Sequence, residues 1–312
     1  MSAQTDKLPI TVLIGATGVG KTAFSLNLAE QLDAEIVAAD SRTIYRGMDI
    51  GTAKATKTEQ QRVRHHLIDV ADPDETWSLA LYQQKSHEAI HEILSRGKNV
   101  LIVGGTGQYI RALLQGWSPP KLQPHPQLRS VLEQIGHEHG KLALYQELEG
   151  IDPQAAEAIE WQNLRRTVRA LEVILTTGEK FSAQRSRVES PYDAHVIGLA
   201  RNREELYQRI DLRIDQMISD GLVEEVQALL NKGYSPEIPS MSAIGYREIC
   251  EYLTGKITLG EAVAAIRKNT RTYVRRQANW FKPKDPTIHW YDISGNQDYN
   301  LPTDFIKDRK PN

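Results

Sequence analysis

Gly15-Ala16-Thr17-Gly18-Val19-Gly20-Lys21-Thr22 is the stretch of this sequence that decides its fold. Two glycines enclose four residues, and a Lys-Thr pair follows. The apolar run at residues 10–14 predicts a buried strand, and apolar residues at helical spacing predict a helix over residues 23–32. In such a strand–loop–helix unit, backbone N–H groups surround phosphate oxygens, Lys21 reaches the outer phosphates and Thr22 can hold a magnesium ion. We therefore predict a phosphate-binding loop (P-loop) rather than a glycine-rich turn with an unrelated Lys-Thr pair.

The composition indicates a nearly neutral globular protein. The 312 residues include 38 Lys and Arg, 40 Asp and Glu and a single cysteine, and the formal net charge is −2. The length suffices for one large domain or two modest ones, and one cysteine excludes an internal disulfide framework. No apolar run approaches a membrane span, and the first residues lack a signal-peptide pattern. We expect a cytoplasmic monomer with no membrane partner, in which local basic patches hold any polyanion.

A second predicted strand, residues 34–39, ends in Asp40-Ser41-Arg42. The carboxyl ends of strands in an open parallel sheet face the ligand crevice. Asp40 is therefore a candidate general base, provided that it lies within hydrogen-bond reach of the proton it accepts. The alternative is a turn or helix cap, since Asp and Ser are common in that role.

A third predicted strand, residues 99–103, leads into Gly104-Gly105-Thr106-Gly107. P-loop ATPases often carry a magnesium-binding aspartate at the end of such a strand. Here the residues are small, and we expect them to let a ligand approach the backbone. Thr106 could offer its hydroxyl to a phosphate or to a base. The missing aspartate disfavours an ATPase but leaves a small-molecule kinase open.

The middle of the chain predicts a helical insertion. Several prolines between residues 119 and 126 mark a boundary, and the clearest helix covers residues 163–177. Its arginines lie off the apolar face, so a solvated surface is their simplest interpretation. A strand at residues 194–199 then returns the chain to the sheet. The expected division is a catalytic core at 1–118 and 191–284, an insertion at 119–190 and a polar tail at 285–312.

The last predicted helix, residues 261–281, is strongly basic. Arg267, Arg271 and Arg275 recur at four-residue spacing, and no acidic residue occurs between Ala262 and Lys282. Since a solvated helix usually mixes its charges, this stripe indicates contact with a nucleic acid. The alternative is that acidic partners elsewhere in the fold neutralise the helix.

Taken together, the motifs resemble those of the tRNA dimethylallyltransferase (tRNA isopentenyltransferase) family. The resemblance spans the P-loop to Lys282, and its specific part is the P-loop together with Asp40-Ser41, His65-His66-Leu67-Ile68-Asp69 and Val103-Gly104-Gly105-Thr106-Gly107. It implies an α/β fold with a P-loop NTPase-like parallel sheet flanked by helices, and an all-helical insertion that clasps the tRNA anticodon stem-loop. It also implies transfer of a dimethylallyl group from dimethylallyl diphosphate to N6 of adenine 37, beside the anticodon, through a channel that the two substrates enter from opposite ends.

The resemblance further implies roles for individual residues. Asp40 matches the catalytic base, and Thr106 matches a threonine that lies in the channel. The diphosphate would be bound by Gly15, Ala16, Thr17, Gly18, Val19, Gly20, Lys21, Thr22 and Arg129, with Mg²⁺ on Thr22. The stretches that match tRNA-contacting regions contain Asp40, Ser41, Arg42, Thr43, Gln162, Asn163, Leu164, Arg165, Arg166, Gly245, Tyr246, Arg247, Arg275, Arg276 and Gln277.

The sequence departs from the family pattern at three positions and leaves other functions open. Thr43 stands where Gln is common, Gln108 where Leu is usual, and Asn279 where Thr is commoner. The alternatives are an isopentenyltransferase that acts on free adenine nucleotides, a small-molecule kinase and a non-catalytic RNA-binding protein. The basic helix and the insertion argue against the first, the missing aspartate against the second, and an intact P-loop with Asp40 against the third.

Overall fold

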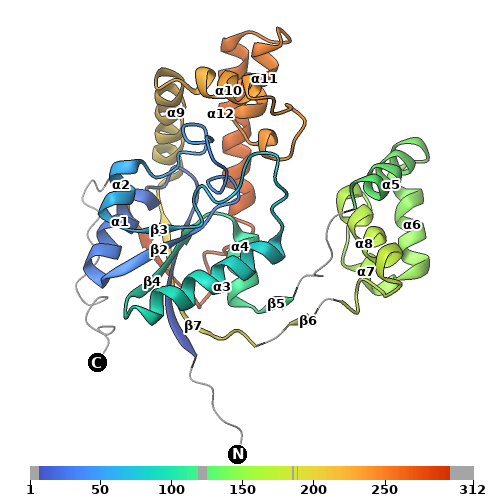
Figure 1. The fold of residues 1–312 in the computed structure, drawn as a ribbon, viewed down its shortest axis with the longest axis horizontal. Helices are drawn as coiled ribbons and strands as arrows, with labels where there is room; N and C mark the ends of the chain where they lie inside the picture. Colours follow the sequence, from blue (N-terminus) through green and yellow to red (C-terminus); the bar gives the residue numbers. More distant parts are fainter. Residues whose placement is uncertain (1–6, 119–124, 185, 188, 296–312) are drawn as a thin grey trace, which may run out of the picture. The chain divides into compact units, whose positions relative to one another are not determined.

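The computed structural model describes residues 7–118, 125–184, 186–187 and 189–295 (Figure 1). The chain divides into two compact units. One contains Met1–Leu114 and Pro191–Asn312, and the other contains Gln115–Ser190. We call them the core unit and the helical unit.

The core unit is built on a six-stranded sheet in the order β3-β2-β4-β1-β7-β8. Every neighbouring pair of strands is parallel, and helices flank the sheet (Figure 1). The predicted α/β class is therefore confirmed. The strands are β1 (Leu8–Gly15), β2 (Ala34–Ala39), β3 (His65–His66), β4 (Asn99–Gly104), β7 (Tyr192–Ala200) and β8 (Ile288–Asp292).

Strand β8 corrects the expected polar tail. Its residues pair with β7 from Val196 opposite Ile288 to Ala200 opposite Asp292, and Ile293 is buried beyond its end. The sequence hides this strand because polar residues surround it and its apolar side chains are few. The remainder of the expected tail, residues 296–312, lies outside the described residues.

Both faces of the central strands are covered, which explains their continuous apolar runs. Successive side chains of a strand point to opposite faces. Leu13 of β1 accordingly packs in one cluster with Leu28 of the first helix, while Val12 packs in another with Ile90. The helices described in the core unit are α1 (Lys21–Leu32), α2 (Lys57–Arg62), α3 (Leu79–Ser95), α4 (Gly107–Leu114), α9 (Arg203–Ser219), α10 (Leu222–Asn231), α11 (Tyr246–Leu253) and α12 (Leu259–Gln277), with a short 3₁₀ turn at Ser240–Ser242.

Helix α12 is shorter than the sequence predicts. It starts with a capping box in which Thr258 and Glu261 satisfy each other's backbone N–H groups. It ends at Gln277, four residues before the predicted end. Trp280 and Phe281 therefore follow the helix in a turn, and their side chains pack in the same cluster as Val12 and Ile90.

The described residues of the helical unit form a short antiparallel pair and four helices. These are β5 (Trp117–Ser118), β6 (Ser186–Arg187), α5 (Pro126–Glu138), α6 (Lys141–Ile151), α7 (Pro153–Glu157) and α8 (Leu164–Thr177). Helix α8 confirms the predicted helix. Asn163 caps its first turn, Gly178 ends it in the left-handed conformation at φ 73°, and its apolar face is buried among the other helices.

A buried carboxylate organises the helical unit. The Glu172 side chain is fully buried, and it accepts hydrogen bonds from the His125 N–H at 2.7 Å, Arg129 Nε at 2.9 Å and Arg169 at 2.6 Å. Burial raises the pKa of this carboxyl, but the three hydrogen bonds outweigh it and the pKa lies below its usual value. Arg129 thus joins α5 to α8, and its expected contact with diphosphate stays a prediction.

We predict that Arg129→Ala loosens the helical unit. The change leaves a buried carboxylate with fewer donors, at a cost of roughly 1.5–3 kcal/mol in the free energy of unfolding. Hydrogen exchange followed by mass spectrometry should show faster exchange in α5 and α8. Lys141→Ala, at an exposed position of the same unit, is the control. If Arg129→Ala leaves exchange unchanged, this ion pair does not stabilise the unit.

Candidate active site

Three loops meet where β1, β2 and β4 end. The order β2-β4-β1 places the P-loop, Asp40 and the Gly104–Gly107 turn at one edge of the sheet. A hydrogen bond of 3.1 Å from the Ser41 N–H to Thr106 Oγ1 joins two of these loops, and the Thr106 N–H donates to the carbonyl of Ala39 at 3.2 Å. The loops that carry Asp40 and Thr106 are therefore neighbours, and the roles predicted for these two residues stay predictions.

The P-loop has the backbone that its glycines allow. Gly18 and Gly20 adopt positive φ angles of 80° and 118°, and Gly20 is the cap of α1. Such angles favour glycine because it lacks a Cβ atom. The loop therefore ends directly at the start of α1, whose free N–H groups and dipole favour an anion.

Lys21 is held at the base of this loop. Its Nζ donates to the carbonyls of Gly15 and Ala16, each at 2.9 Å. Burial lowers the pKa of Lys21 to about 8; the charge of Asp40 opposes this shift, and that of Arg213 adds to it. Burial thus makes the charged form of Lys21 less favourable. A bound phosphate would offset this desolvation cost through its negative charge.

Three arginines that the sequence did not single out lie near the P-loop: Arg209 and Arg213 belong to α9, and Arg201 precedes it. Arg209 Nε donates to the carbonyl of Gly18 at 3.2 Å, and Arg201 Nε, just before the helix, donates to that of Val19 at 3.2 Å. Burial lowers the pKa of Arg213, whereas the charge of Asp40 raises it. The spacing of Arg209 and Arg213, beside the apolar positions Ile210 and Ile214, is the signal that could have identified them.

A cavity of about 480 Å³ opens beside these groups. Thr17, Asp40 and Arg213 border it together with Tyr273 and Arg276 of α12. The Ser242–Gly245 segment and Arg247 also belong to the lining. Predicted phosphate-binding, catalytic and RNA-contacting residues thus surround one space.

Asp40 caps a turn and also borders the cavity. Its Oδ1 accepts a hydrogen bond of 2.8 Å from the Arg42 N–H, as a turn-capping aspartate does. Its Oδ2 accepts no hydrogen bond from any residue that the structure describes. Asp40 also lies in the cavity near the charges of Lys21 and Arg213. One oxygen therefore fixes the side chain, and the role of Asp40 as a general base stays a prediction.

Gln277 joins the end of α12 to two of the loops. Its Oε1 accepts the Thr17 N–H at 2.9 Å, and its Nε2 donates to the Gly105 carbonyl at 3.0 Å. A Cβ atom on Gly105 would lie 2.3 Å from Gln277 Nε2, and one on Gly107 would lie 2.2 Å from Trp280. The glycines after β4 thus make room for the Gln277 and Trp280 side chains. The sequence analysis expected a ligand to approach the backbone here, and the protein's own side chains occupy that space instead.

Several residues predicted to contact RNA are enclosed in the core unit. Gln277 and Thr43 are 6% and 9% exposed, and Tyr246 is fully buried with its hydroxyl bonded to Glu225. These side chains are packed inside the core unit, and their contact with RNA stays a prediction. Arg42 bonds the carbonyls of Pro239 and Ser240 and also borders the cavity, as do Ser41 and Gly245.

The arginine stripe of α12 is partly neutralised. Arg267 pairs with Asp215 and Arg271 with Asp211, both from α9. For these two residues the alternative interpretation, neutralisation by acidic partners, is correct. Arg276 borders the cavity, and no carboxylate within the described ranges pairs with Arg275 or Arg276.

In the helical unit, the predicted RNA-contacting stretch covers the start of α8. Gln162, Arg165 and Arg166 are exposed, while Asn163 and Leu164 are partly buried. Neither Arg165 nor Arg166 has a carboxylate partner in the part of the chain that the structure describes. Their contact with RNA stays a prediction.

Thr22 is the one predicted metal ligand. It lies exposed in the first turn of α1, and its hydroxyl makes no hydrogen bond to the described residues. Across those residues no group of three or more His, Cys, Asp or Glu side chains could hold a metal ion. Because Mg²⁺ commonly binds through few protein oxygens together with substrate phosphates, a lone hydroxyl beside a phosphate cradle fits that ion.

The comparisons with known proteins agree with this geometry. The IPP transferase family model matches residues 43–284. The chain belongs to this family. A tRNA dimethylallyltransferase from Roseiflexus sp. is 50% identical over 88% of this chain and 90% of its own length, and one from Thermomicrobium roseum is 46% identical over 92% and 87%. The predicted family is confirmed.

Solved structures of tRNA-modifying transferases are also similar to this chain. The tRNA isopentenylpyrophosphate transferase of Bacillus halodurans is 39% identical, with a TM-score of 0.69 over 97% of this chain and 94% of that one. A eukaryotic dimethylallyltransferase acting on tRNA is 26% identical, with a TM-score of 0.79 over 97% of this chain and 80% of its own. None of the described helices is both long and apolar enough to span a membrane.

We predict that Gln277→Leu weakens the binding of inorganic diphosphate by roughly tenfold. The change leaves the Thr17 N–H and the Gly105 carbonyl unpaired, so the P-loop loses its anchor. Isothermal titration calorimetry with Mg²⁺ present would measure the Kd. Gln227→Leu is the matched control, since Gln227 is exposed and its side chain donates to Asn231 on its own helix. A wild-type Kd in Gln277→Leu would mean that the P-loop keeps its shape without this anchor.

Proposed function

We propose that this protein transfers a dimethylallyl group from dimethylallyl diphosphate to N6 of the adenine at position 37 of tRNA, beside the anticodon. The observation that carries the proposal is the cavity that Asp40 shares with the P-loop residue Thr17 and Arg213. It offers cations for a leaving diphosphate and a carboxylate for a proton in one space. The tRNA dimethylallyltransferases that resemble this chain over most of its length support the same activity.

The P-loop side of the cavity would act on the donor. When the allylic C–O bond breaks, its electron pair leaves with the diphosphate, and the negative charge on that group grows. Lys21, Arg213 and the N–H groups at the start of α1 are already in place to stabilise it. Preorganised charges in a site that excludes water are worth more than the same charges in solution.

Asp40 would act on the acceptor. The N6 lone pair of adenine forms the new N–C bond, and the nitrogen then carries a surplus proton. The free Oδ2 of Asp40 accepts that proton, while the hydrogen bond from the Arg42 N–H to Oδ1 keeps the carboxylate oriented. The balanced products are N6-dimethylallyl adenine in tRNA, diphosphate and one proton.

Mg²⁺ is the proposed metal ion. Thr22 would hold it together with the oxygens of the diphosphate, and the ion would supply further stabilisation of the leaving group's charge. Lys21 and Arg213 would stabilise the same negative charge with their own positive charges.

Phosphoryl transfer is the less favoured function. At the end of β4, where an ATPase commonly has its magnesium-binding acid, the Gly105 carbonyl accepts a hydrogen bond from Gln277. Transfer to free AMP is also less favoured. A mononucleotide needs neither the exposed arginines of α8 nor Arg247 and Arg276 at the rim of the cavity.

The direct test is a nucleoside analysis. Unmodified tRNA would be incubated with the protein, Mg²⁺ and dimethylallyl diphosphate, digested and examined by mass spectrometry, and nuclease mapping would locate the product. We expect N6-dimethylallyl adenosine beside the anticodon. Prenylation of AMP but not of tRNA would contradict the proposed acceptor, and phosphoryl transfer from ATP would contradict the reaction class.

We predict that Asp40→Asn lowers kcat by roughly 10²- to 10⁴-fold, the range for loss of a general base. The amide oxygen can still accept the hydrogen bond from the Arg42 N–H, so the loop keeps its shape. The Kd values for tRNA and diphosphate should therefore stay near those of the wild type. Asp74→Asn, at an exposed loop position, is the control. A kcat close to wild type would remove Asp40 from the proton transfer.

A further inference from the structure

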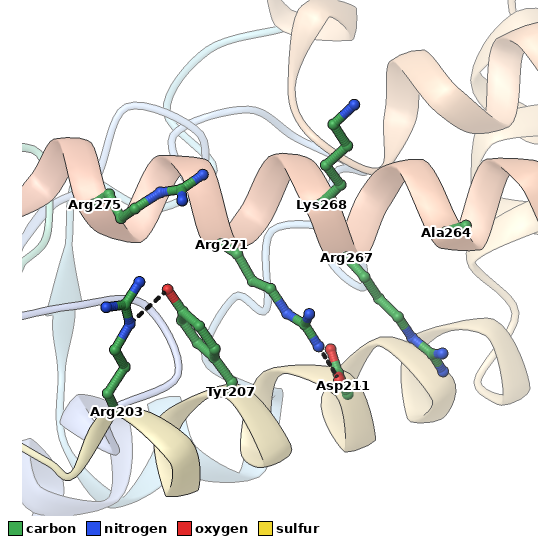
Figure 2. Close-up of a pocket in the computed structure, with 8 residues that line it drawn as sticks. All are labelled: Arg203, Tyr207, Asp211, Ala264, Arg267, Lys268, Arg271 and Arg275. Carbon is green, nitrogen blue, oxygen red and sulfur yellow. Dashed lines mark hydrogen bonds and ion pairs between the residues drawn. The ribbon is translucent and has the colours of Figure 1, made fainter.

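A second concave surface lies between α9 and α12. We call it the α9–α12 groove; its volume is about 530 Å³ (Figure 2). Five cationic side chains border it: Arg203, Arg267, Lys268, Arg271 and Arg275. None of the five has a role in the activity proposed above, although Arg275 lies in a stretch that matches tRNA-contacting regions.

Two of the five cations form the fixed floor of the groove. Arg271 and Arg267 pair with Asp211 and Asp215 of α9. The Arg271 guanidinium also lies 5.2 Å from the centre of the Tyr207 ring, and Figure 2 shows Arg271 and Arg267 directed toward α9. These contacts join the two helices and neutralise both charges.

The other three cations are left for a ligand. Among the described residues no carboxylate pairs with Arg203, Lys268 or Arg275. The Arg203 guanidinium carbon lies 5.4 Å from the centre of the Tyr207 ring, and Arg203 Nε donates to the Tyr207 hydroxyl at 3.2 Å. Arg275 donates to Thr272 Oγ1 at 3.0 Å, and Lys268 extends away from α9 (Figure 2). The groove therefore presents a surplus of positive charge on a rigid base.

The groove is separate from the cavity that contains Asp40. Tyr273 and Arg276 border the cavity, whereas Arg271 and Arg275 border the groove. Since successive residues of an α-helix turn by about 100°, these pairs occupy different faces of α12. Arg275 borders the groove and the adjacent Arg276 borders the cavity. One polyanionic chain could therefore contact the groove and the cavity at this point.

We propose that the α9–α12 groove binds phosphates of the tRNA backbone away from the target adenine. The inference rests on the proposed function, which brings an RNA to the cavity on the neighbouring face of α12. Guanidinium and ammonium groups in an open groove suit phosphodiester oxygens, which need charge and donors but no base-specific pocket. Arg203 and Lys268 thus become RNA-binding residues, and Arg267 and Arg271 become their supports.

The test is the salt dependence of tRNA binding. Fluorescence anisotropy with labelled, unmodified tRNA would give Kd over a series of KCl concentrations for the wild type and for the double variant Arg203→Ala/Lys268→Ala. Each lost phosphate contact should reduce the slope of log K against log[salt] by about 0.7–0.9, so the double variant should lose roughly 1.5. Its Kd for inorganic diphosphate should equal that of the wild type.

Two matched variants make the result specific. Lys232→Ala removes an exposed cation elsewhere in the core unit and should leave the slope unchanged. Arg203→Lys/Lys268→Arg keeps both charges and should retain the wild-type slope. An unchanged slope in the Ala double variant, or an equal loss in Lys232→Ala, overturns the proposal. Binding of an acidic peptide in the groove, with no effect of the Ala double variant on the slope for tRNA, also overturns the proposal.

Failure of the groove and failure of the proposed function give different results. If the wild type prenylates tRNA but the Ala double variant keeps its slope, only the groove assignment is wrong. If the wild type does not prenylate tRNA, the activity proposed above is wrong, whatever the slopes. Circular dichroism and Tm measurements on each variant exclude unfolding as the cause of a changed slope.

Discussion

The double hydrogen bond of Gln277 is the interaction on which the rest of the site depends. Its amide accepts from the Thr17 N–H of the P-loop and donates to the Gly105 carbonyl after β4. The end of α12 is thereby fixed to two neighbouring strand ends, and Arg276 is brought to the rim of the cavity. A buried amide with both ends satisfied specifies one arrangement, because any shift leaves two polar groups unpaired.

This arrangement explains how a P-loop can support chemistry other than phosphoryl transfer. The cations around the loop come from α1 and α9, and the position of the usual magnesium-binding acid is occupied by the link to Gln277. In the proposed function, the site would therefore stabilise a diphosphate as a whole, and Asp40 would remain available for a proton. A leaving diphosphate and an amine nucleophile need those two functions.

The local features of this fold could be predicted from the sequence, and the long-range ones could not. The P-loop, the strands that end at Asp40 and Gly104, and helix α8 follow from periodicity, glycine positions and caps. Strand β8 was missed because its signal is short and surrounded by polar residues. The hydrogen bonds of Gln277 and the ion pairs of Arg267 and Arg271 join segments that are distant in sequence, and no local pattern contains them.

The central claim is that the P-loop holds diphosphate as the leaving group of an alkyl transfer. Dimethylallyl diphosphate that carries oxygen-18 in the oxygen between C1 and phosphorus tests this claim most directly. After a single turnover with tRNA, mass spectrometry would locate the label. The account predicts that all of it is found in the released diphosphate, since the C–O bond breaks. Label retained on the organic fragment would show P–O cleavage and contradict the account.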